Sequence, residues 1–463
     1  MQLTPEDANK NPLDLPEIRD RISLFLERKD CLSCMRVSRD WFKEFVKRVW
    51  CRIDFAKDSK FNNIDPKTLD KYGSLIKLAL KISTFEHILS LQHPQVNSVE
   101  LVSVLLFGNW HYRELFSHFV RRCGGEIRNM TIHCTVPYLD NVDEQRIRAC
   151  QFVHVNTLLT CPMPKRSSTL GCGLSLECLE LSRTCLTREG FSALLQYSPV
   201  LRKLKLFRVV VLRYNPAFEL FRDSRITSLE APLGEILIPD NALPSSPSLL
   251  VHLPLLKEWH VTSLDRTDAW TDDSFRSEMS THCPLLKSFQ FDHFNSTKLS
   301  DLLLNCAQDL ESCTFPACNL YISTVFACVS HQRTLTSITL MDKFQRQDSP
   351  EMQWAYFLPK LCFNLKALSM EGLILDMKSV ENQPWTCLGL QELRVQFRGL
   401  DSNDGIEQCV KQVCAWRQSG DSTLVRTMDK DTILSKVSLH LVQFKQLSTL
   451  WAGTKERNPG QRP

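Results

Sequence analysis

The residue types that most often carry chemistry are present in this chain but do not gather into a reactive pattern. Cys31 and Cys34 form one C-x-x-C, and a zinc site would need a second pair at a suitable spacing, which the sequence lacks. His133, His154 and His260 lie near predicted strands, where a structural or surface role is common. No G-x-S-x-G, P-loop or H-E-x-x-H segment occurs, and only 15 of 463 residues are glycine. We therefore expect no catalytic residue, no metal and no cofactor.

Charged residues between the apolar positions of predicted strands are better candidates, because such side chains can bind a protein. The candidate target-binding residues are Arg202, Lys203, Lys205, Glu230, Lys257, His260 and Lys287. Glu180 and Glu230 flank the Lys205 row, so the patch has mixed charge, which favours specificity and encounter rate. We expect an acidic or phosphorylated segment of a target protein to contact it. The alternative is an ordinary solvated sheet face.

Later strands carry small, neutral residues in the equivalent positions. These are Ser312, Thr314, Thr336, Ser337, Thr339, Ala367 and Ser369, and charge returns at Glu392 and Arg394. The predicted face is therefore charged in its first half and smooth in its second half.

A recurring pattern, apolar-x-x-apolar-x-apolar, must position these side chains. It occurs thirteen times, beginning at Leu75, Val96, Ile127, Val155, Leu176, Leu201, Ile226, Leu256, Leu286, Leu310, Leu335, Leu365 and Leu390. The intervals of about 20–30 residues and the L-x-x-L-x-L form are typical of leucine-rich repeats. Each unit contributes a short strand whose apolar side chains point inward, and neighbouring units stack into a parallel sheet. The alternative is a set of unrelated strands in an α/β protein.

Return segments on the outside of the sheet should connect these strands. Helices are predicted for residues 186–195, 273–282 and 406–416, and Pro199, Pro254 and Pro284 should turn the chain into the next strand. Residues 232–254 are predicted to form a longer loop. The pattern Leu434-Val437-Leu439 predicts a last, capping strand, with residues 444–451 closing the array.

Before the array, three short helices are predicted between residues 11 and 50. Asp14 can cap the first helix and Pro16 suits its first turn, while Asp30 and Ser38 can cap the second and third helices. The predicted apolar residues are Ile18, Ile22, Phe25 and Leu26, then Leu32, Met35 and Val37, then Trp41, Phe42, Phe45, Val49 and Trp50. A core of this size is marginal alone and gains from a partner or from packing on the adjoining array.

These residues resemble the F-box, and the pattern is most similar to F-box proteins of fungi. The matching segments are Leu15-Pro16, Ile18, Leu26, Asp30-Cys31-Leu32, Val37-Ser38-Arg39-Asp40-Trp41 and Trp50. The resemblance implies binding to the Skp-type adaptor of a cullin ubiquitin ligase. The residues implied to bind the adaptor are Leu15, Pro16, Ile18, Leu32 and Val37. The alternative is an N-terminal helical cap for the repeat array.

Composition agrees with a protein of the cytosol or nucleus. Hydrophobic residues make up 43% and charged residues 23% of the chain, with a formal net charge of +4. This weak basic excess does not indicate nucleic acid binding. No apolar run approaches the ~20 residues of a membrane helix, and the polar start is unlike a signal peptide. The 19 cysteines are accordingly expected to be reduced thiols.

The sequence thus predicts an α/β protein with an F-box-like three-helix domain at residues 11–55 and a connector at 56–72. A leucine-rich-repeat array should follow at 73–420, then a C-terminal cap at 421–452 and a disordered tail at 453–463. With the resemblance, these domains imply a non-catalytic substrate receptor of an SCF-type ubiquitin ligase, partnered by adaptor, cullin and a target protein. The alternative is a protein-interaction scaffold that does not lead to degradation.

Overall fold

The structure is a computed structural model of the chain. It describes residues 13, 15–56, 66–82, 96–102, 125–133, 174–182, 184–207, 209–212, 221–233, 248–262, 272–292, 304, 309–316, 321–341, 352–382, 384–398, 411, 413, 433–444 and 446–452. The chain divides into two compact units, Met1–Arg225 and Ile226–Pro463, and the division falls inside the predicted repeat array. Predictions for Asp14, for residues 57–65 and for the tail at 453–463 lie outside the described residues.

The first unit begins with the three predicted helices. They are α1 (Pro16–Phe25), α2 (Arg28–Cys34) and α3 (Arg39–Cys51). Pro16 occupies the first turn of α1, and the Ser38 hydroxyl caps α3 by accepting the Trp41 N–H at 3.3 Å. Asp30 does not cap α2, because α2 begins two residues earlier; Asp30 lies in its first turn instead, where a carboxylate interacts favourably with the helix dipole.

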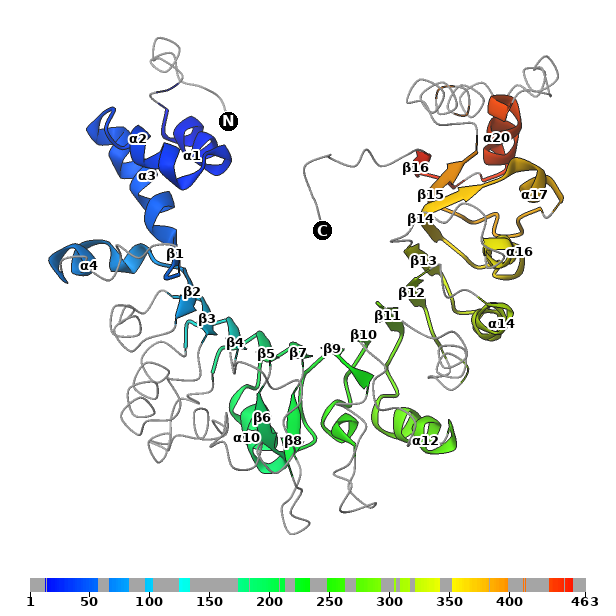
Figure 1. Cartoon of the computed structure of the whole chain (residues 1–463), viewed down its shortest axis with the longest axis horizontal. Coiled ribbons are helices and arrows are strands. Elements are labelled where there is room, and N and C mark those ends of the chain that lie inside the picture. The colour runs from blue at the N-terminus through cyan, green and yellow to red at the C-terminus, as the bar shows by residue number, and fades with distance from the viewer. Residues whose placement is uncertain are drawn as a thin grey trace. The chain divides into compact units, whose positions relative to one another are not determined.

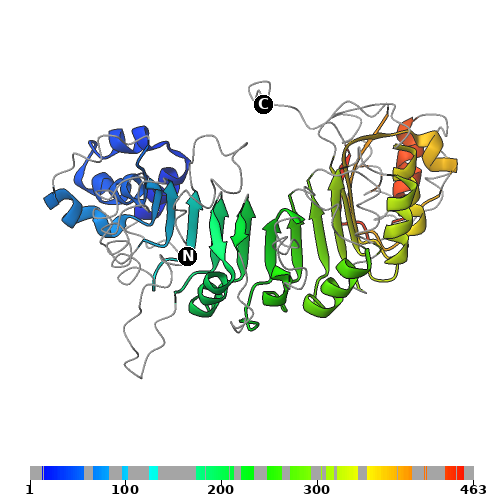
Figure 2. The same ribbon diagram turned by 60° about the horizontal axis from the view of Figure 1, so that its bottom comes forward.

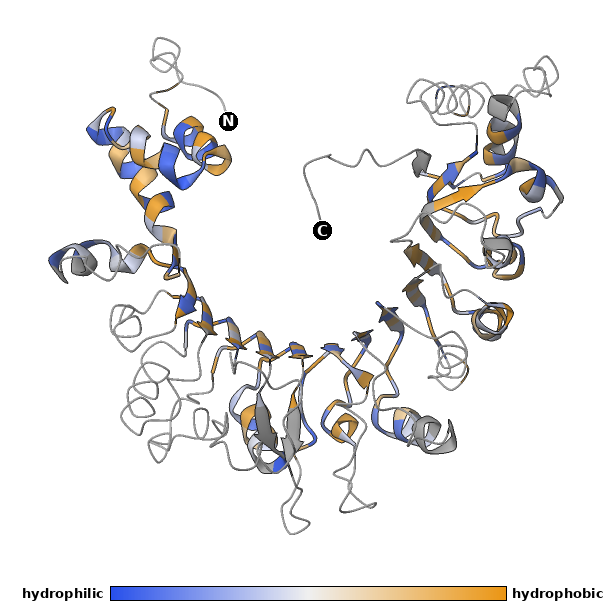
Figure 3. Ribbon diagram, viewed as in Figure 1, coloured by the Kyte–Doolittle hydropathy of each residue, from blue (hydrophilic) through white to orange (hydrophobic). Residues whose placement is uncertain are grey.

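The helical core is small and centres on α3. Cys31, Phe45 and Val49 are fully or almost fully buried, and the Trp41 and Phe45 rings stack with centroids 5.2 Å apart. Ile22, Leu26, Cys34, Met35, Trp41 and Trp50 pack partly buried against them. The prediction that Phe25 belongs to this core was wrong, because α1 turns Phe25 outward and buries Arg19 and Ser23 instead. Figure 3 shows orange and blue residues alternating along these helices.

The third helix passes directly into the sheet of the first unit. Arg52 follows the last residue of α3 and begins β1 (Arg52–Asp54), which pairs with β2 (Leu78–Ile82). Between them, α4 (Pro66–Tyr72) and a 3-10 turn, η4 (Gly73–Leu75), pack against the helices: the Tyr72 ring lies 5.4 Å from Trp50 and 6.3 Å from Phe42. The predicted connector therefore includes a helix that joins the helical core to the first strands.

Parallel strands make up the sheet of each unit. In the first unit β1 and β2 are followed by β3 (Ser98–Val102), β4 (Asn129–His133), β5 (Cys178–Ser182) and β7 (Lys203–Phe207), each paired with the next. Figure 2 shows these strands side by side with their arrows in one direction. A separate pair, β6 (Cys185–Thr187) and β8 (Val210–Leu212), lies beside α10 (Arg188–Tyr197).

The second unit repeats this arrangement. Its strands are β9 (Ser228–Ala231), β10 (Glu258–Val261), β11 (Ser288–Phe291), β12 (Ser312–Pro316), β13 (Ser337–Met341), β14 (Ala367–Leu375), β15 (Glu392–Phe397) and β16 (Thr449–Ala452). All neighbouring pairs are parallel. Between them come η5 (Leu249–His252), α12 (Asp272–His282), α14 (Ile322–Ser330), α15 (Met352–Ala355), α16 (Phe357–Leu361), α17 (Met377–Asn382) and α20 (Ile433–Val442). Figure 1 shows the labelled helices on one side of this sheet, and we call the other side its open face.

The predicted apolar register is confirmed in eleven of the thirteen repeats. All three apolar positions are at most 2% exposed in the repeats beginning at Val96, Ile127, Leu176, Leu201, Ile226, Leu256, Leu286, Leu310, Leu335, Leu365 and Leu390. Because a strand alternates its side chains between two faces, the intervening residues point to the open face. Each buried set packs on the next; for example, the Trp259 and Phe289 rings on β10 and β11 lie 6.1 Å apart.

Two repeats differ from the sequence-based interpretation. At β2 the buried residues are Ile76, Ala79 and Ile82 rather than Leu75, Leu78 and Leu80, because the register shifts there and Lys81 has a left-handed φ of 54°. Residues 155–160 lie outside the described residues, and β4 pairs directly with β5, so no repeat strand separates these two.

Helix predictions were also adjusted by the structure. The return helix expected at 186–195 begins at Arg188, after the short strand β6, whereas α12 closely matches its predicted span of 273–282. The last-strand prediction at 434–439 was wrong. That segment lies in α20, where Val437 and Leu441, four residues apart, bury one helical face. The last strand is β16, and of the return helix predicted at 406–416 only Lys411 and Val413 are described.

We predict that Leu340→Asp unfolds the second unit far more easily than Thr339→Asp. Leu340 is fully buried, so the aspartate would be a buried charge without a partner, whereas the Thr339 side chain points to the open face. Urea unfolding should show a loss of more than about 3 kcal/mol for the first variant and under about 1 kcal/mol for the second. Equal unfolding midpoints would contradict the register.

A second prediction concerns His440 of α20, which packs between Trp385 and Phe444 with ring centroids 4.8 and 5.4 Å away. Its Nδ1 lies 2.9 Å from Gln443 Nε2, and its Nε2 is buried without a hydrogen-bond partner. Burial lowers the pKa of His440 from 6.5 to about 4. Because the folded pKa lies below the unfolded one, the unfolded chain binds the proton first, and stability falls as pH drops from 6.5 towards 4.

The expected loss from this histidine is about 2 kcal/mol between pH 7 and pH 4.5. Denaturant unfolding of the wild type and of His440→Phe at both pH values measures it, and the variant should lose correspondingly less stability on acidification. His282→Gln is the control, because His282 faces Glu278 at 3.5 Å rather than a buried aromatic cage. An identical pH dependence in the wild type and His440→Phe would overturn the assignment.

Candidate protein-binding surfaces

The predicted adaptor-binding residues all remain accessible on the helical part of the first unit. Pro16, Leu32 and Val37 are exposed, while Leu15 and Ile18 are half-buried. They come from the start of α1, from α2 and from the turn between α2 and α3. Leu32 and Val37 therefore form apolar surface on the helices that does not pack into the small helical core.

Sequence reasoning missed the most exposed apolar side chain in this part of the molecule. Phe25 is 88% exposed and its neighbour Leu24 is 57% exposed, at the end of α1. A helical period placed Phe25 with the core residues Ile22 and Leu26. Phe25 itself lies within α1, but the face that α1 buries carries Arg19 and Ser23 and leaves Phe25 in solvent. The apolar spacing gave no signal of this, because Arg19 and Ser23 are polar. Phe25 therefore joins Leu32 and Val37 as a candidate contact for a partner.

The C-x-x-C packs within this helical core. Cys31 and Cys34 are free thiols one turn apart on α2. Burial, and then the neighbouring thiol, raises the pKa of Cys31, and burial raises the pKa of Cys34. Protonated thiols are poor nucleophiles and poor metal ligands, so these two cysteines serve as apolar packing residues.

Among the residues that the structure describes, no group of three or more histidine, cysteine or acidic side chains could hold a metal ion. No helix in the described part of the chain is long and apolar enough to cross a membrane.

The candidate target-binding residues divide between the two units. Arg202, Lys203 and Lys205 belong to the first unit, with Lys203 and Lys205 on β7; Lys205 is in register with Glu180 of β5. On β4 of the same unit His133 lies 4.0 Å from both Glu100 and Glu180, which come from the two flanking strands. Basic side chains and carboxylates therefore alternate across this face.

The other four candidates, Glu230, Lys257, His260 and Lys287, belong to the second unit. His260 of β10 lies between two carboxylates: its Nδ1 is 3.8 Å from Glu230 Oε1 and its Nε2 is 2.9 Å from Asp292 Oδ1. Lys287 donates a hydrogen bond to Glu311, and this bond and the charge attraction raise the pKa of Lys287. His260 and Lys287 thus already have anionic neighbours.

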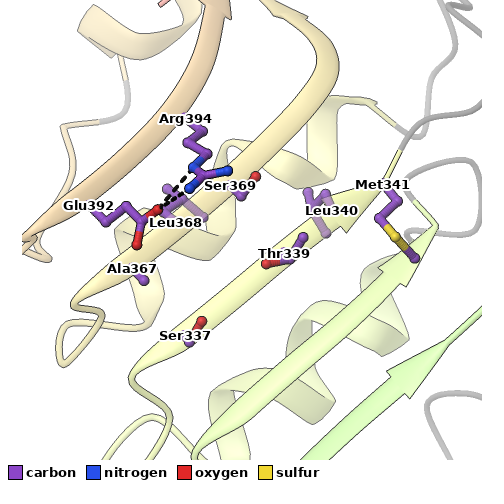
Figure 4. Close-up of a pocket in the computed structure, with 9 residues that line it drawn as sticks. All are labelled: Ser337, Thr339, Leu340, Met341, Ala367, Leu368, Ser369, Glu392 and Arg394. Carbon is purple, nitrogen blue, oxygen red and sulfur yellow. Dashed lines mark hydrogen bonds and ion pairs between the residues drawn. The ribbon is translucent and has the colours of Figure 1, made fainter. Parts of the chain in front are cut away.

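Further along the same open face the side chains become small, and the surface is hollowed. The hollow has a volume of about 410 Å³ and is lined by Ser337, Thr339, Leu340, Met341, Ala367, Leu368, Ser369, Glu392 and Arg394. Figure 4 shows that these residues come from three neighbouring strands, with Glu392 and Arg394 forming one wall. The Arg394 Nε and Nη2 atoms donate to Glu392 Oε1 at 2.9 and 2.7 Å.

These features define the class of the protein. Parallel strands that bury a repeated L-x-x-L-x-L pattern and carry helices on one side form the architecture of leucine-rich repeats. The open face is lined by polar and charged side chains, and its hollow is partly open to solvent. Such a surface suits the binding of another protein better than the enclosed, mostly apolar pocket that small molecules occupy.

Comparisons with known proteins give a structural likeness. No protein-family model and no curated protein sequence matches the chain. A solved structure described as "Crystal structure of TLR13-ssRNA13 complex" is similar at 14% identity and a TM-score of 0.29. The match covers 70% of this chain and 52% of that one, so the chain spans about half the length of this neighbour.

Proposed function

We propose that the chain is the substrate-recognition subunit of an SCF-type ubiquitin ligase, in which the helical part binds a Skp-type adaptor and the open sheet face binds a target. The observation that carries the proposal is the exposed apolar surface of α1–α3. Phe25, Leu32 and Val37 are 88%, 47% and 65% exposed, and the core that these three helices share is small. A small unit with unused apolar surface gains stability by covering it with a partner.

The connection between helices and sheet supports the same role. The last turn of α3 leads without a linker into β1, and Tyr72 packs on Trp50 and Phe42 of α3. A receptor must hold its target at a defined place relative to the ligase, and a continuous helix-to-strand joint of this kind limits movement between adaptor and repeats. The receptor itself performs no catalysis in this proposal and acts in the cytosol or nucleus.

The docking prediction is that Leu15→Ala with Pro16→Ala, or Phe25→Ala alone, reduces recovery of a co-expressed Skp-type adaptor at least about tenfold. Exposed apolar anchors carry most of the free energy of such contacts. Phe326→Ala is the matched control, because Phe326 is another accessible phenylalanine, 60% exposed on the outer helix α14 of the second unit. Wild-type recovery of adaptor by the Leu15/Pro16 and Phe25 variants, with the fold intact by circular dichroism, would contradict the proposal.

A non-degradative scaffold is the second candidate function, and protein turnover distinguishes it from a receptor. The full-length Phe25→Ala chain should still bind targets through its open face while failing to join the ligase. Proteins that co-purify with this variant should therefore persist longer in cells that express it in place of the wild type. Unchanged half-lives, with adaptor binding lost, would favour the scaffold.

A further inference from the structure

The open face of the second unit carries two features that lie on one sheet and differ in chemistry. Strands β9–β11 carry an acidic cluster around a histidine, and β13–β15 form the hollow. The strands between them pair without interruption, β11 to β12 and β12 to β13. The described helices of this unit lie on the other side of the sheet (Figure 1), so a partner can cross both features.

The acidic cluster consists of Glu230, Glu258 and Asp292 around His260. Glu230 and His260 are in register on neighbouring strands, and Glu258 lies two residues before His260 on the same face. The two lysines nearby, Lys257 and Lys287, precede the strands at their starting edge, and Lys287 already bonds to Glu311. Negative charge therefore dominates the middle of this face, and a cationic side chain of a partner is complementary to it.

The hollow requires a different side chain. Ser337, Thr339, Ala367 and Ser369 are small and half-buried, so an incoming side chain can sink between them and Arg394. Three of the four carry hydroxyls, which donate and accept hydrogen bonds and would be left unpaired under a purely aliphatic group. An aromatic side chain with one polar atom, tyrosine or tryptophan, fits the space and can hydrogen-bond to one of these hydroxyls.

We propose that the second unit binds an extended segment of a target protein that carries a lysine or arginine against the His260 cluster and a tyrosine or tryptophan in the hollow. From β10 to the boundary of β13 and β14 is three to four strand spacings, or about 17 Å at ~4.8 Å per strand. An extended chain covers ~3.3 Å per residue and points every second side chain to the same face, so the two side chains lie about four or six residues apart. The proposal deepens the proposed function, since it names the chemistry of the target.

The proposed basic and aromatic segment differs from the acidic or phosphorylated segment that the sequence predicted. An acidic segment on β9–β11 would lie against three carboxylates. Of the two nearby lysines, Lys287 already donates a hydrogen bond to Glu311, and Lys257 precedes the first residue of β10. Like charges brought together in a desolvated interface weaken binding. The cationic residues Lys203 and Lys205 belong to the first unit, and they provide the competing test.

The experiment pans phage-displayed random dodecapeptides on the purified full-length chain and measures affinities of the enriched peptides by fluorescence anisotropy. Enriched sequences should carry Lys or Arg and, four or six residues away, Tyr or Trp, and their binding should weaken with added salt. Enrichment of acidic peptides, or no enrichment, overturns the proposal.

Variants then locate the peptides on the surface. Glu230→Lys with Asp292→Lys, and separately Ser369→Trp, should each weaken binding at least about tenfold, the first by charge and the second by filling the hollow. Thr339→Trp fills the same hollow from β13 if Ser369→Trp does not fold. Asn129→Trp on β4 of the first unit is the matched control and should bind as wild type. Wild-type affinity in the folded hollow or charge variants overturns the proposal.

The competing variant is Lys203→Glu with Lys205→Glu. If it abolishes binding while the variants of the second unit do not, the target lies on the first unit and the proposal fails. Adaptor pull-down is run in parallel and is independent of these surfaces. Peptide binding without adaptor binding would support the proposed target segment and contradict the ligase role. Adaptor binding without peptide binding would contradict the proposed target segment alone.

Discussion

The repeated hydrogen-bonded step at the start of each strand is the constraint on which both units depend. In the second unit the N–H of Lys287 donates to the carbonyl of Lys257, that of Glu311 to Lys287 and that of Thr336 to Glu311, at 2.8–2.9 Å. This ladder fixes the spacing of successive repeats, and the buried apolar residues two and four positions later then stack in rows. A repeat has no other way to cover its apolar side, so each depends on its neighbours.

The same constraint determines where polar chemistry can lie. Because inward positions must be apolar to stack, the charged and hydroxyl side chains of a strand are displaced to the open face or to the strand edges. Buried cysteines that precede the strands follow the same rule. Cys283 lies between α12 and β11 and Cys387 between α17 and β15, and burial raises the pKa of each thiol to about 12, so both remain protonated packing residues. The polar groups available for binding a partner therefore lie on the surface, in rows of side chains from neighbouring strands.

The helical part of the first unit is stabilised differently. Its core contains three well-buried residues, and it is held from outside by Tyr72 and by the passage of α3 into β1. That support lets the helices keep Phe25, Leu32 and Val37 in solvent without losing their fold. A surface of this kind is stable when covered by a partner, which links the packing of the helices to the docking role proposed for them.

Most of the fold could be predicted from the sequence, because the apolar spacing is a local property. Leu310, Cys313 and Phe315 indicate a buried strand by type and spacing alone, and Ser38 indicates a helix start in the same way. The predictions failed where tertiary contacts override spacing. Lys81 adopts a left-handed conformation that shifts the β2 register, and the segment at 434–439 forms a helix because Val437 and Leu441 bury one helical face.

The candidate sites show the same division. Sequence alone identified the small-residue strands and the charged ones, since both are properties of single positions. It could not show that the ion pair of Glu392 and Arg394 lines a hollow beside Thr339 and Ser369. Nor could it show that His260 lies between Glu230 and Asp292. The strands that carry these residues are tens of positions apart in the chain, and only the register of neighbouring strands brings their side chains together.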